Sequence, residues 1–262
     1  MTIETESGVI VALDHGLHWG TFPGFEDYRG TLETVLEGEP DGILGSVPFL
    51  NRFRDVLDAS AATTRVGTLD VIHDSTIPGA DDGAEIHRQA FSLEEAARVG
   101  ADAVKVCVVY GREDPDVLAH NIEFAARIAE NGREYGLDVV LEQVLWGNRI
   151  EDDQNPDLIE HAARLGVELG ADALKLYYPG QERLDAITAN TPCPVFVAGG
   201  AQSGDTRQFL ETTRDAMDAG ASGVTYGRNV WQHDDPSAMV RALKAIVNDG
   251  ASPSKALSHL DG

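Results

Sequence analysis

Short apolar runs of strand length alternate with helix-like stretches along this 262-residue chain. Strands are expected at Val9–Asp14, Gly42–Ser46, Val66–Ile72, Ala103–Tyr110, Val139–Leu145, within Gly170–Gly180, at Pro194–Ala198 and at Gly223–Tyr226. Helices are expected at Asp27–Leu36, Arg52–Ala59, Ser92–Val99, Pro115–Tyr135, Asn155–Leu169, Thr206–Asp218 and Ser237–Asn248. Strands that alternate with helices form parallel sheets, and eight such units close into a barrel. We therefore expect an α/β fold with a single (β/α)8 TIM barrel, one domain over residues 1–262.

A doubly wound open sheet is the alternative fold. It would call for a Gly-x-Gly-x-x-Gly turn after the first strand, and no such turn follows Asp14. An internal echo favours repeated units, because Val99–Val106 matches Leu169–Leu176 nearly residue for residue. We interpret this echo as shared unit geometry and leave gene duplication open.

Composition narrows the possible binding partners and the expected cellular environment of the protein. The formal net charge is −24 and the pI is about 4.5, which argues against nucleic acid or an anionic membrane surface as a partner. Dispersed acidity with only four lysines suggests a halophilic source. Met1–Gly8 is polar and no run approaches the roughly 18 apolar residues of a membrane span, so we expect a cytoplasmic protein. Cys107 and Cys193 are expected to be reduced core residues.

One lysine lies in the middle of the apolar strand expected within Gly170–Gly180. In Ala173-Leu174-Lys175-Leu176-Tyr177-Tyr178, alternation places Ala173, Lys175 and Tyr177 on one face. A buried ammonium is costly unless it is paired or gives up its proton, and lysines that do so form Schiff bases with carbonyl substrates. Lys175 is therefore the candidate nucleophile, and a core lysine paired with a carboxylate is the plainer alternative.

Candidate acid–base groups stand at the other strand ends, where barrel enzymes gather their active sites. Asp14 and Glu142 are the carboxylates that could shuttle protons beside the lysine. Glu142 could instead be only a counter-ion of Lys105 or Lys175. A metal site is the competing chemistry, since His15 lies close to His18 in the sequence and His73-Asp74 ends another strand. No tight ligand motif joins these residues, so we expect neither a metal nor another cofactor.

Glycines after the last two strands indicate a phosphate site. Barrel enzymes often cradle phosphate with backbone amides from the loops after strands seven and eight. Gly199-Gly200 and Gly227-Arg228 occupy those two loops. Lys105 is expected to face the interior, where it could bind a substrate anion or lower the pKa of Lys175.

With these residues placed, the chain resembles the archaeal-type class I aldolases, a family that includes fructose-bisphosphate aldolases and 2-amino-3,7-dideoxy-D-threo-hept-6-ulosonate synthases. The likeness runs through Leu13–Gly16, from His161 to Lys175, through Val197–Gly200 and through Gly227–Gln232. It implies a Schiff base at Lys175 and an acid–base or carbinolamine role for Asp14. It also implies a self-assembled ring, commonly a decamer, and phosphate binding by Gly199, Gly200, Gly227 and Arg228.

The chain departs from that family at the end of the fifth strand. The family carries a tyrosine there in a Tyr-Pro-Arg-Gly motif, whereas this chain has Val144 at the aligned position. That tyrosine is the proton-transfer residue of the family. Either Glu142, Tyr110 or His15 takes over this role in the present chain, or its substrate and reaction differ from those of the family.

The leading hypothesis is a metal-independent aldolase that forms an imine with a ketose phosphate, by default fructose 1,6-bisphosphate. A transaldolase-like heptulosonate synthase, or another enzyme of phosphosugars or acyl groups, is the nearest rival. A phosphosugar isomerase with Glu142 as its base belongs to a different mechanistic class. A non-enzymatic phosphosugar-binding protein is the remaining alternative.

Overall fold

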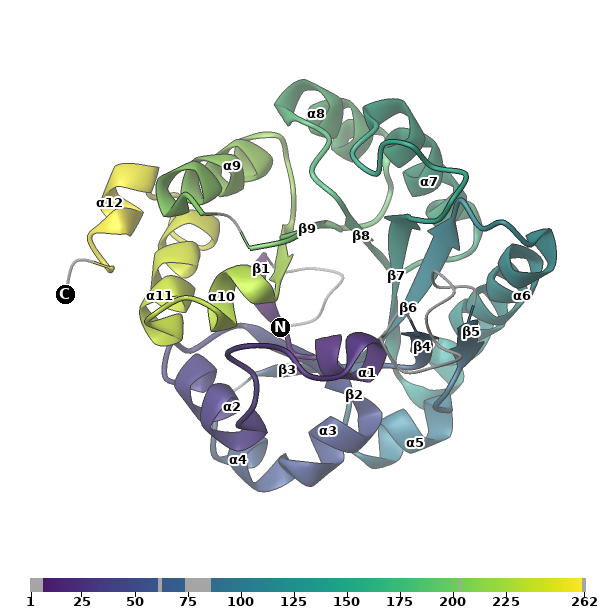
Figure 1. The fold of residues 1–262 in the computed structure, drawn as a ribbon, viewed down its shortest axis with the longest axis horizontal. Coiled ribbons are helices and arrows are strands. Elements are labelled where there is room, and N and C mark those ends of the chain that lie inside the picture. Colours follow the sequence, from purple (N-terminus) through teal and green to yellow (C-terminus); the bar gives the residue numbers. More distant parts are fainter. Residues whose placement is uncertain (1–6, 61–62, 74–85, 203, 261–262) are drawn as a thin grey trace.

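The computed structural model describes residues 7–60, 63–73, 86–202 and 204–260. Eight parallel strands close a barrel in the order β1-β10-β9-β8-β7-β6-β3-β2 (Figure 1). Its strands are β1 (Gly8–Ala12), β2 (Gly42–Ser46), β3 (Thr64–Thr68), β6 (Ala103–Tyr110), β7 (Asp138–Leu145), β8 (Ala173–Leu176), β9 (Val195–Ala198) and β10 (Gly223–Tyr226). The expected barrel is confirmed. The open-sheet alternative is wrong, because β1 pairs with both β2 and β10.

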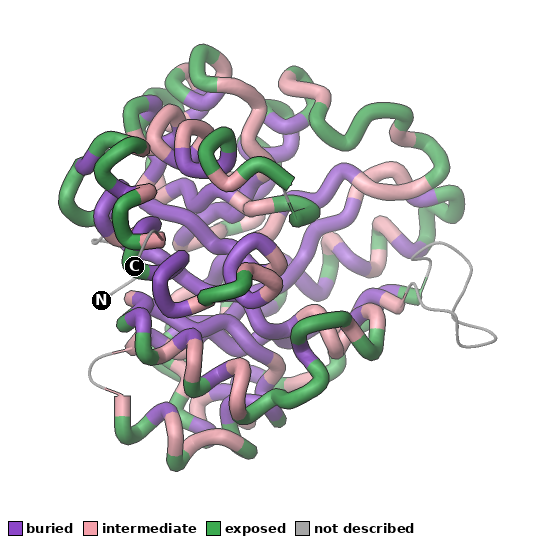
Figure 2. Tube along the Cα trace, turned by 60° about the vertical axis from the view of Figure 1, so that its left-hand side comes forward, coloured by how far each residue is buried: buried purple, intermediate pink, exposed green. Residues whose placement is uncertain are grey.

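Helices surround the barrel and bury its outer face. The ring comprises α2 (Tyr28–Leu36), α3 (Val47–Arg52), α4 (Arg54–Ala59), α5 (Leu93–Arg98), α6 (Pro115–Asn131), α7 (Pro156–Glu168), α8 (Gln181–Asn190), α9 (Thr206–Asp218) and α11 (Pro236–Val247). Figure 2 shows buried strands in the middle and exposed residues along the outer helices. The short helices α1 (His15–Trp19) and α10 (Arg228–Trp231) lie inside this ring in Figure 1. The 3-10 turn η1 (Gly132–Tyr135) extends α6, and α12 (Pro253–Leu257) packs on α9 and α11.

The internal echo in the sequence has a structural cause. Gly100 and Gly170 both end a helix with positive φ values of 79° and 93°, where a β-carbon would be strained. The aspartates that follow repeat one hydrogen bond, since Asp102 Oδ2 accepts from Arg65 N and Asp172 Oδ2 accepts from Val139 N. In each case the carboxylate ties the start of one strand to its neighbour, so the echo reflects shared unit geometry.

The structure differs from the sequence expectation at the third strand and in the region after β8, among other places. The third strand, expected over Val66–Ile72, is divided into β3 and β4 (Asp70–His73), and β4 leaves the barrel to pair antiparallel with β5 (Ile86–Gln89). Leu69 O accepts backbone hydrogen bonds from Ala90 and Phe91, which holds the end of β5 beside the start of β4. Helix α8 was absent from the sequence expectation, because Leu184 and Ile187 are its only buried side chains and its pattern is weak. Asp74 and residues 1–6 lie outside the described residues.

The barrel interior is layered from apolar to charged. Its floor is an apolar cluster of Ile10, Ala12, Leu44, Val66, Ala103, Val140, Ala173 and Phe196. One step further along the strands, towards their carboxyl ends, the interior positions carry charges instead. Side-chain alternation fixes this change, because Lys105, Glu142 and Lys175 each follow a floor residue by two positions. The fold therefore places charged groups at the end of the barrel where (β/α)8 enzymes work.

Candidate active site

Strand register brings the two interior lysines to one carboxylate. Glu142 on β7 is paired with Lys175 on β8 and with Cys107 on β6. Glu142 Oε1 lies 2.7 Å from Lys175 Nζ, and Glu142 Oε2 lies 3.4 Å from Lys105 Nζ. The carboxylate thus bridges both ammonium groups. Burial opposes its charge, but Lys175 and Lys105 outweigh burial and lower the pKa of Glu142, so it is ionised at neutral pH.

Lys105 lies at the centre of a buried ring of acids. Besides Glu142, its Nζ is 3.1 Å from Asp14 Oδ2 and 3.9 Å from Asp70 Oδ1, and the side chain is only 1% exposed. Burial by itself would lower the pKa of Lys105, but the facing acids hold it well above the ordinary value. Lys105 is therefore a fixed cation that neutralises carboxylates. Lys105 lines the same cavity as Arg228, and three carboxylates already surround its ammonium group.

Asp14 has its side chain turned into the barrel although it stands at the N-cap of α1. It makes no side-chain capping bond; Thr68 Oγ1 donates to its Oδ2 at 2.8 Å instead. His18 Nε2 lies 3.5 Å from the same oxygen, and His18 is oriented by Ile72 N, which donates to its Nδ1. Burial raises the pKa of Asp14, but Lys105, His18 and His15 together outweigh this effect and hold the pKa well below the usual range. Asp14 is therefore a proton acceptor rather than a donor.

Asp70 and His87 extend this network of charged groups, and the sequence did not predict them as site residues. His87 Nε2 is 2.8 Å from Asp70 Oδ2, and both residues have no exposed surface. The same oxygen accepts from Cys107 N at 2.9 Å. Burial opposes ionisation, but Lys105 and His87 lower the pKa of Asp70 to about 2. Asp70 lies on β4 and His87 on β5, so the pairing of these two strands positions both residues. The sequence of β5 is polar and has no hydrophobic pattern, so this strand was not predicted.

A cavity of about 200 Å³ opens above these charges. Lys175, Glu142, Asp14 and Lys105 line it. Its other walls are His15, His18, Trp19, Ile72, Cys107, Val144, Trp146, Asp153, Tyr177 and Arg228. The indole rings of Trp19 and Trp146 lie 6.1 Å apart and add apolar surface to the cavity wall. Such a chamber excludes water around a reacting lysine and strengthens the electrostatic interactions there.

The loops after β9 and β10 meet beside this chamber. Asn229 Nδ2 donates to Gly199 O and to Ala201 O, which fixes one loop against the other. Gly200 has a φ of 65° and open space where a β-carbon would be, and Gly199 and Gly200 line a second cavity of about 230 Å³. Arg228 lines the lysine cavity, and its buried Nε has no hydrogen-bond partner among the described residues. A buried donor left unpaired beside an open loop suits an anion.

Gly227 is required by a close approach. A β-carbon there would lie 2.3 Å from His15 Cε1 and 3.0 Å from Ala12 O. His15 Nδ1 is 3.8 Å from Asp14 Oδ1, and burial is the largest of the effects that lower the pKa of His15 to about 4. His15 is therefore neutral above pH 5 and lies in the cavity wall.

Tyr110 is the candidate that the structure moves away from the site. It follows Val109 at the end of β6 and faces the helices, and its hydroxyl donates to Gln143 Oε1 at 2.8 Å. Alternation along the strand is the reason, since Lys105, Cys107 and Val109 take the inward positions. Tyr110 therefore lies outside the lysine cavity. His73 does not line the cavity either. Both cysteines are free, as expected.

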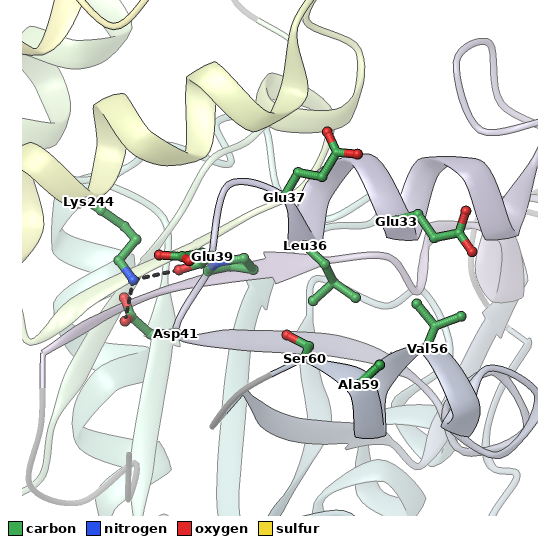
Figure 3. A pocket seen from close by; sticks show the side chains of 10 residues that line it. Glu33, Leu36, Glu37, Glu39, Asp41, Val56, Ala59, Ser60 and Lys244 are labelled. Atoms are coloured by element: carbon green, nitrogen blue, oxygen red, sulfur yellow. Dashed lines mark hydrogen bonds and ion pairs between the residues drawn. The ribbon is translucent and has the colours of Figure 1, made fainter.

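A larger cavity, of about 750 Å³, lies at the opposite end of the barrel and carries different chemistry (Figure 3). Its charged side chains are Glu33, Glu37, Glu39, Asp41 and Lys244. Lys244 Nζ is already paired with Asp41 Oδ1 at 3.1 Å. Both nucleophiles among its described lining residues are paired, since Ser60 Oγ lies 2.9 Å from Thr63 Oγ1, so we assign the site to the lysine cavity. Within the described part of the chain, no group of three or more His, Cys, Asp or Glu side chains is arranged to hold a metal ion.

Comparison with known proteins agrees with this geometry. The family described as DeoC/LacD family aldolase matches residues 8–233. This chain belongs to the DeoC/LacD aldolase family. A 2-amino-3,7-dideoxy-D-threo-hept-6-ulosonate synthase of Halobacterium salinarum is 34% identical over 253 residues, 95% of this chain and 89% of that protein. A class 1 fructose-bisphosphate aldolase of the same species is 38% identical over 172 residues, 65% of this chain and 64% of that protein.

Solved structures place this aldolase beside archaeal relatives. An archaeal fructose 1,6-bisphosphate aldolase superposes with a TM-score of 0.80 and 25% identity, over 93% of this chain and 94% of that one. A second such structure, whose catalytic lysine is covalently bound to the carbinolamine intermediate, has a TM-score of 0.80, 25% identity and coverage of 92% and 94%. The aldolase reading of the sequence is thereby confirmed.

Proposed function

We propose that this aldolase works through an imine between Lys175 and a ketose phosphate, with fructose 1,6-bisphosphate as its substrate. The observation that carries the proposal is the contact of 2.7 Å between Lys175 Nζ and Glu142 Oε1 at the floor of an enclosed cavity. A lysine must lose its proton before it attacks a carbonyl, and Glu142 is positioned to take that proton. The protonated imine then accepts the electron pair of the neighbouring carbon–carbon bond.

The other site residues have distinct roles in this scheme. Asp14, ionised and held by Thr68, accepts the proton that the lysine nitrogen releases when the carbinolamine forms, and returns it to the hydroxyl that leaves as water. Gly199, Gly200, Gly227 and Arg228 bind the phosphate, with the unpaired Arg228 Nε as the supporting observation. His15 shapes the cavity. An isomerase with Glu142 as its base is less suited to the geometry, because that carboxylate is committed to two lysines.

A second candidate function rests on the share of this chain that aligns with each relative. The hept-6-ulosonate synthase of Halobacterium salinarum aligns with 95% of this chain, whereas the fructose-bisphosphate aldolase of that species aligns with 65%. We therefore propose a transaldolase-like synthase as the alternative, with the same imine at Lys175. The two reactions differ in the carbonyl compound that accepts the donor fragment.

The test is turnover with EDTA present. We expect cleavage of fructose 1,6-bisphosphate by the unaltered protein, no turnover by Lys175→Met, and unchanged turnover by Lys255→Met, whose lysine is exposed on α12. If the unaltered protein condenses the donor only with other aldehydes, the synthase is favoured. If Lys175→Met retains turnover, the imine proposal is wrong.

The setting of the enzyme is also a proposal. We propose a homo-oligomer in a salt-rich cytoplasm; the net charge of −24 supports the salt requirement, and the family resemblance supports the ring. Among the described residues, no helix is long and apolar enough to cross a bilayer. Light scattering and circular dichroism between low and high salt would test both parts, and a salt-indifferent monomer would contradict them.

A further inference from the structure

Tyr177 forms part of the wall between the two cavities of the site. It lines the lysine cavity, and it also lines the cavity that contains Gly199 and Gly200. It follows Lys175 by two residues, just beyond the end of β8, and both side chains line the lysine cavity. A substrate joined to Lys175 and extending out of the barrel would therefore pass its ring.

The hydroxyl of Tyr177 is uncommitted, unlike those of comparable tyrosines. It makes no hydrogen bond with any residue that the structure describes. By contrast, Tyr110 donates to Gln143 at 2.8 Å, and the Tyr226 hydroxyl lies 3.2 Å from Thr213 Oγ1. A partly buried phenol that faces a cavity without a partner is available to a ligand.

Three of the other titratable groups at the cavity are poor proton donors. Asp14 and Glu142 have lowered pKa values and are ionised, and His15 has a pKa of about 4 and is neutral. Burial is the largest effect that raises the pKa of Tyr177, with the charge of Glu142 adding to it and Arg228 opposing it. The Tyr177 phenol thus keeps its proton at neutral pH, and a nearby cation is positioned to stabilise the phenolate that a transfer would leave.

We propose that the Tyr177 hydroxyl carries the proton to and from the substrate oxygen at the carbon–carbon bond step. This proposal rests on the imine function of Lys175. In condensation, the enamine carbon attacks the aldehyde carbon and a new carbon–carbon bond forms. The aldehyde double bond opens, its oxygen takes the proton of Tyr177, and the enamine nitrogen becomes a protonated imine. The phenolate takes a proton from water; in cleavage the same transfers run in reverse.

The residues around Tyr177 are compatible with the proposed role of its hydroxyl. Val144, across the same cavity, offers only methyl groups, and Ile72 and Cys107 complete an apolar cluster against which the Tyr177 ring packs. Apolar packing fixes the ring while leaving its hydroxyl end free. Glu142 and Asp14 serve the imine end of the substrate, which leaves the Tyr177 hydroxyl for the aldehyde end.

The test separates imine formation from bond formation. Tyr177→Phe is compared with Tyr135→Phe, whose tyrosine is exposed on η1. Two readouts report the imine alone: borohydride trapping of dihydroxyacetone phosphate on Lys175, and exchange of the donor's carbon-bound hydrogen in heavy water. The third readout is condensation with glyceraldehyde 3-phosphate. We expect Tyr177→Phe to keep trapping and exchange within about threefold and to lose condensation by about 10²-fold or more.

Each other outcome has a definite meaning. Condensation within about threefold of the unaltered protein would overturn the role of Tyr177. Equal loss of trapping and condensation would show that the ring only supports the cavity, which also overturns the proposal. If the unaltered protein is never trapped, the imine function itself fails, and the Tyr177 role fails with it.

Discussion

Replacing Lys105 by methionine tests whether this lysine neutralises the buried acids. Its Nζ lies 3.1 Å from Asp14, 3.4 Å from Glu142 and 3.9 Å from Asp70. Methionine keeps much of the length and removes the charge. Glu142 would retain Lys175, whereas Asp14 and Asp70 would lose their only lysine. Removing one partner of a buried pair costs about 3–5 kcal/mol, so we expect the free energy of unfolding at pH 7 to fall by about that amount.

The pH dependence of this loss has a definite sign. Lys105 lowers the folded-state pKa of Asp14 and Asp70 below their values in the unfolded chain, so in the unaltered protein these groups add stability above about pH 4. That contribution is lost as the pH falls through the folded pKa values. Without Lys105, only the neighbouring histidines oppose the effect of burial, so we expect both pKa values to rise and ionisation above about pH 4 to contribute less stability. The difference between the two proteins should therefore grow from pH 4 to pH 7.

Urea unfolding at fixed salt measures this difference. Midpoints and slopes are compared at pH 4.5 and pH 7 for the unaltered protein, Lys105→Met and Lys255→Met. The exposed Lys255 should change the free energy of unfolding by no more than about 0.5 kcal/mol. If Lys105→Met loses no more stability at pH 7 than at pH 4.5, Lys105 does not neutralise these acids and the reasoning is wrong.

Three further predictions concern the cavity wall. Gly227→Ala should cost about 1–3 kcal/mol in thermal or urea unfolding, because its β-carbon would overlap His15, whereas Gly204→Ala, which has open space, should cost far less. Arg228→Gln should raise the KM for a phosphorylated substrate by about tenfold or more while changing kcat less, and an unchanged KM would remove Arg228 from the phosphate site. His15 should leave no titration between pH 5 and 8, because its pKa is about 4. His15→Gln should therefore keep the shape of the pH–rate profile, and the loss of a limb near pH 6 would contradict this.

The barrel could be predicted because its signals are local. Apolar runs bounded by glycine mark the strands, and side-chain alternation along Ala173–Leu176 and Ala103–Tyr110 already placed Lys175 and Lys105 in the interior. The same alternation, applied to Tyr110, would have turned it outward. Its position at a strand end suggested the site, but it follows Lys105 by five residues, an odd number, so its side chain points to the helices.

The Asp70–His87 pair could not be found in the same way. It depends on a hairpin whose second strand, Ile86–Gln89, is short, polar and mostly exposed, so it has no hydrophobic pattern. Helix α8 was not predicted from the sequence for a similar reason, because its hydrophobic pattern is weak. The central position of Lys105 among three acids also required the register between strands that are distant in sequence, and register depends on tertiary pairing rather than on any local motif.

Borohydride trapping tests the central claim most directly. The protein, in high salt, is incubated with dihydroxyacetone phosphate or fructose 1,6-bisphosphate and reduced, and the modified peptide is identified by mass. We expect one stable adduct on Lys175, which is absent in Lys175→Met and present in Lys255→Met. An adduct on Lys105 would move the reacting group from β8 to β6, and no adduct with any ketose phosphate would contradict an imine mechanism.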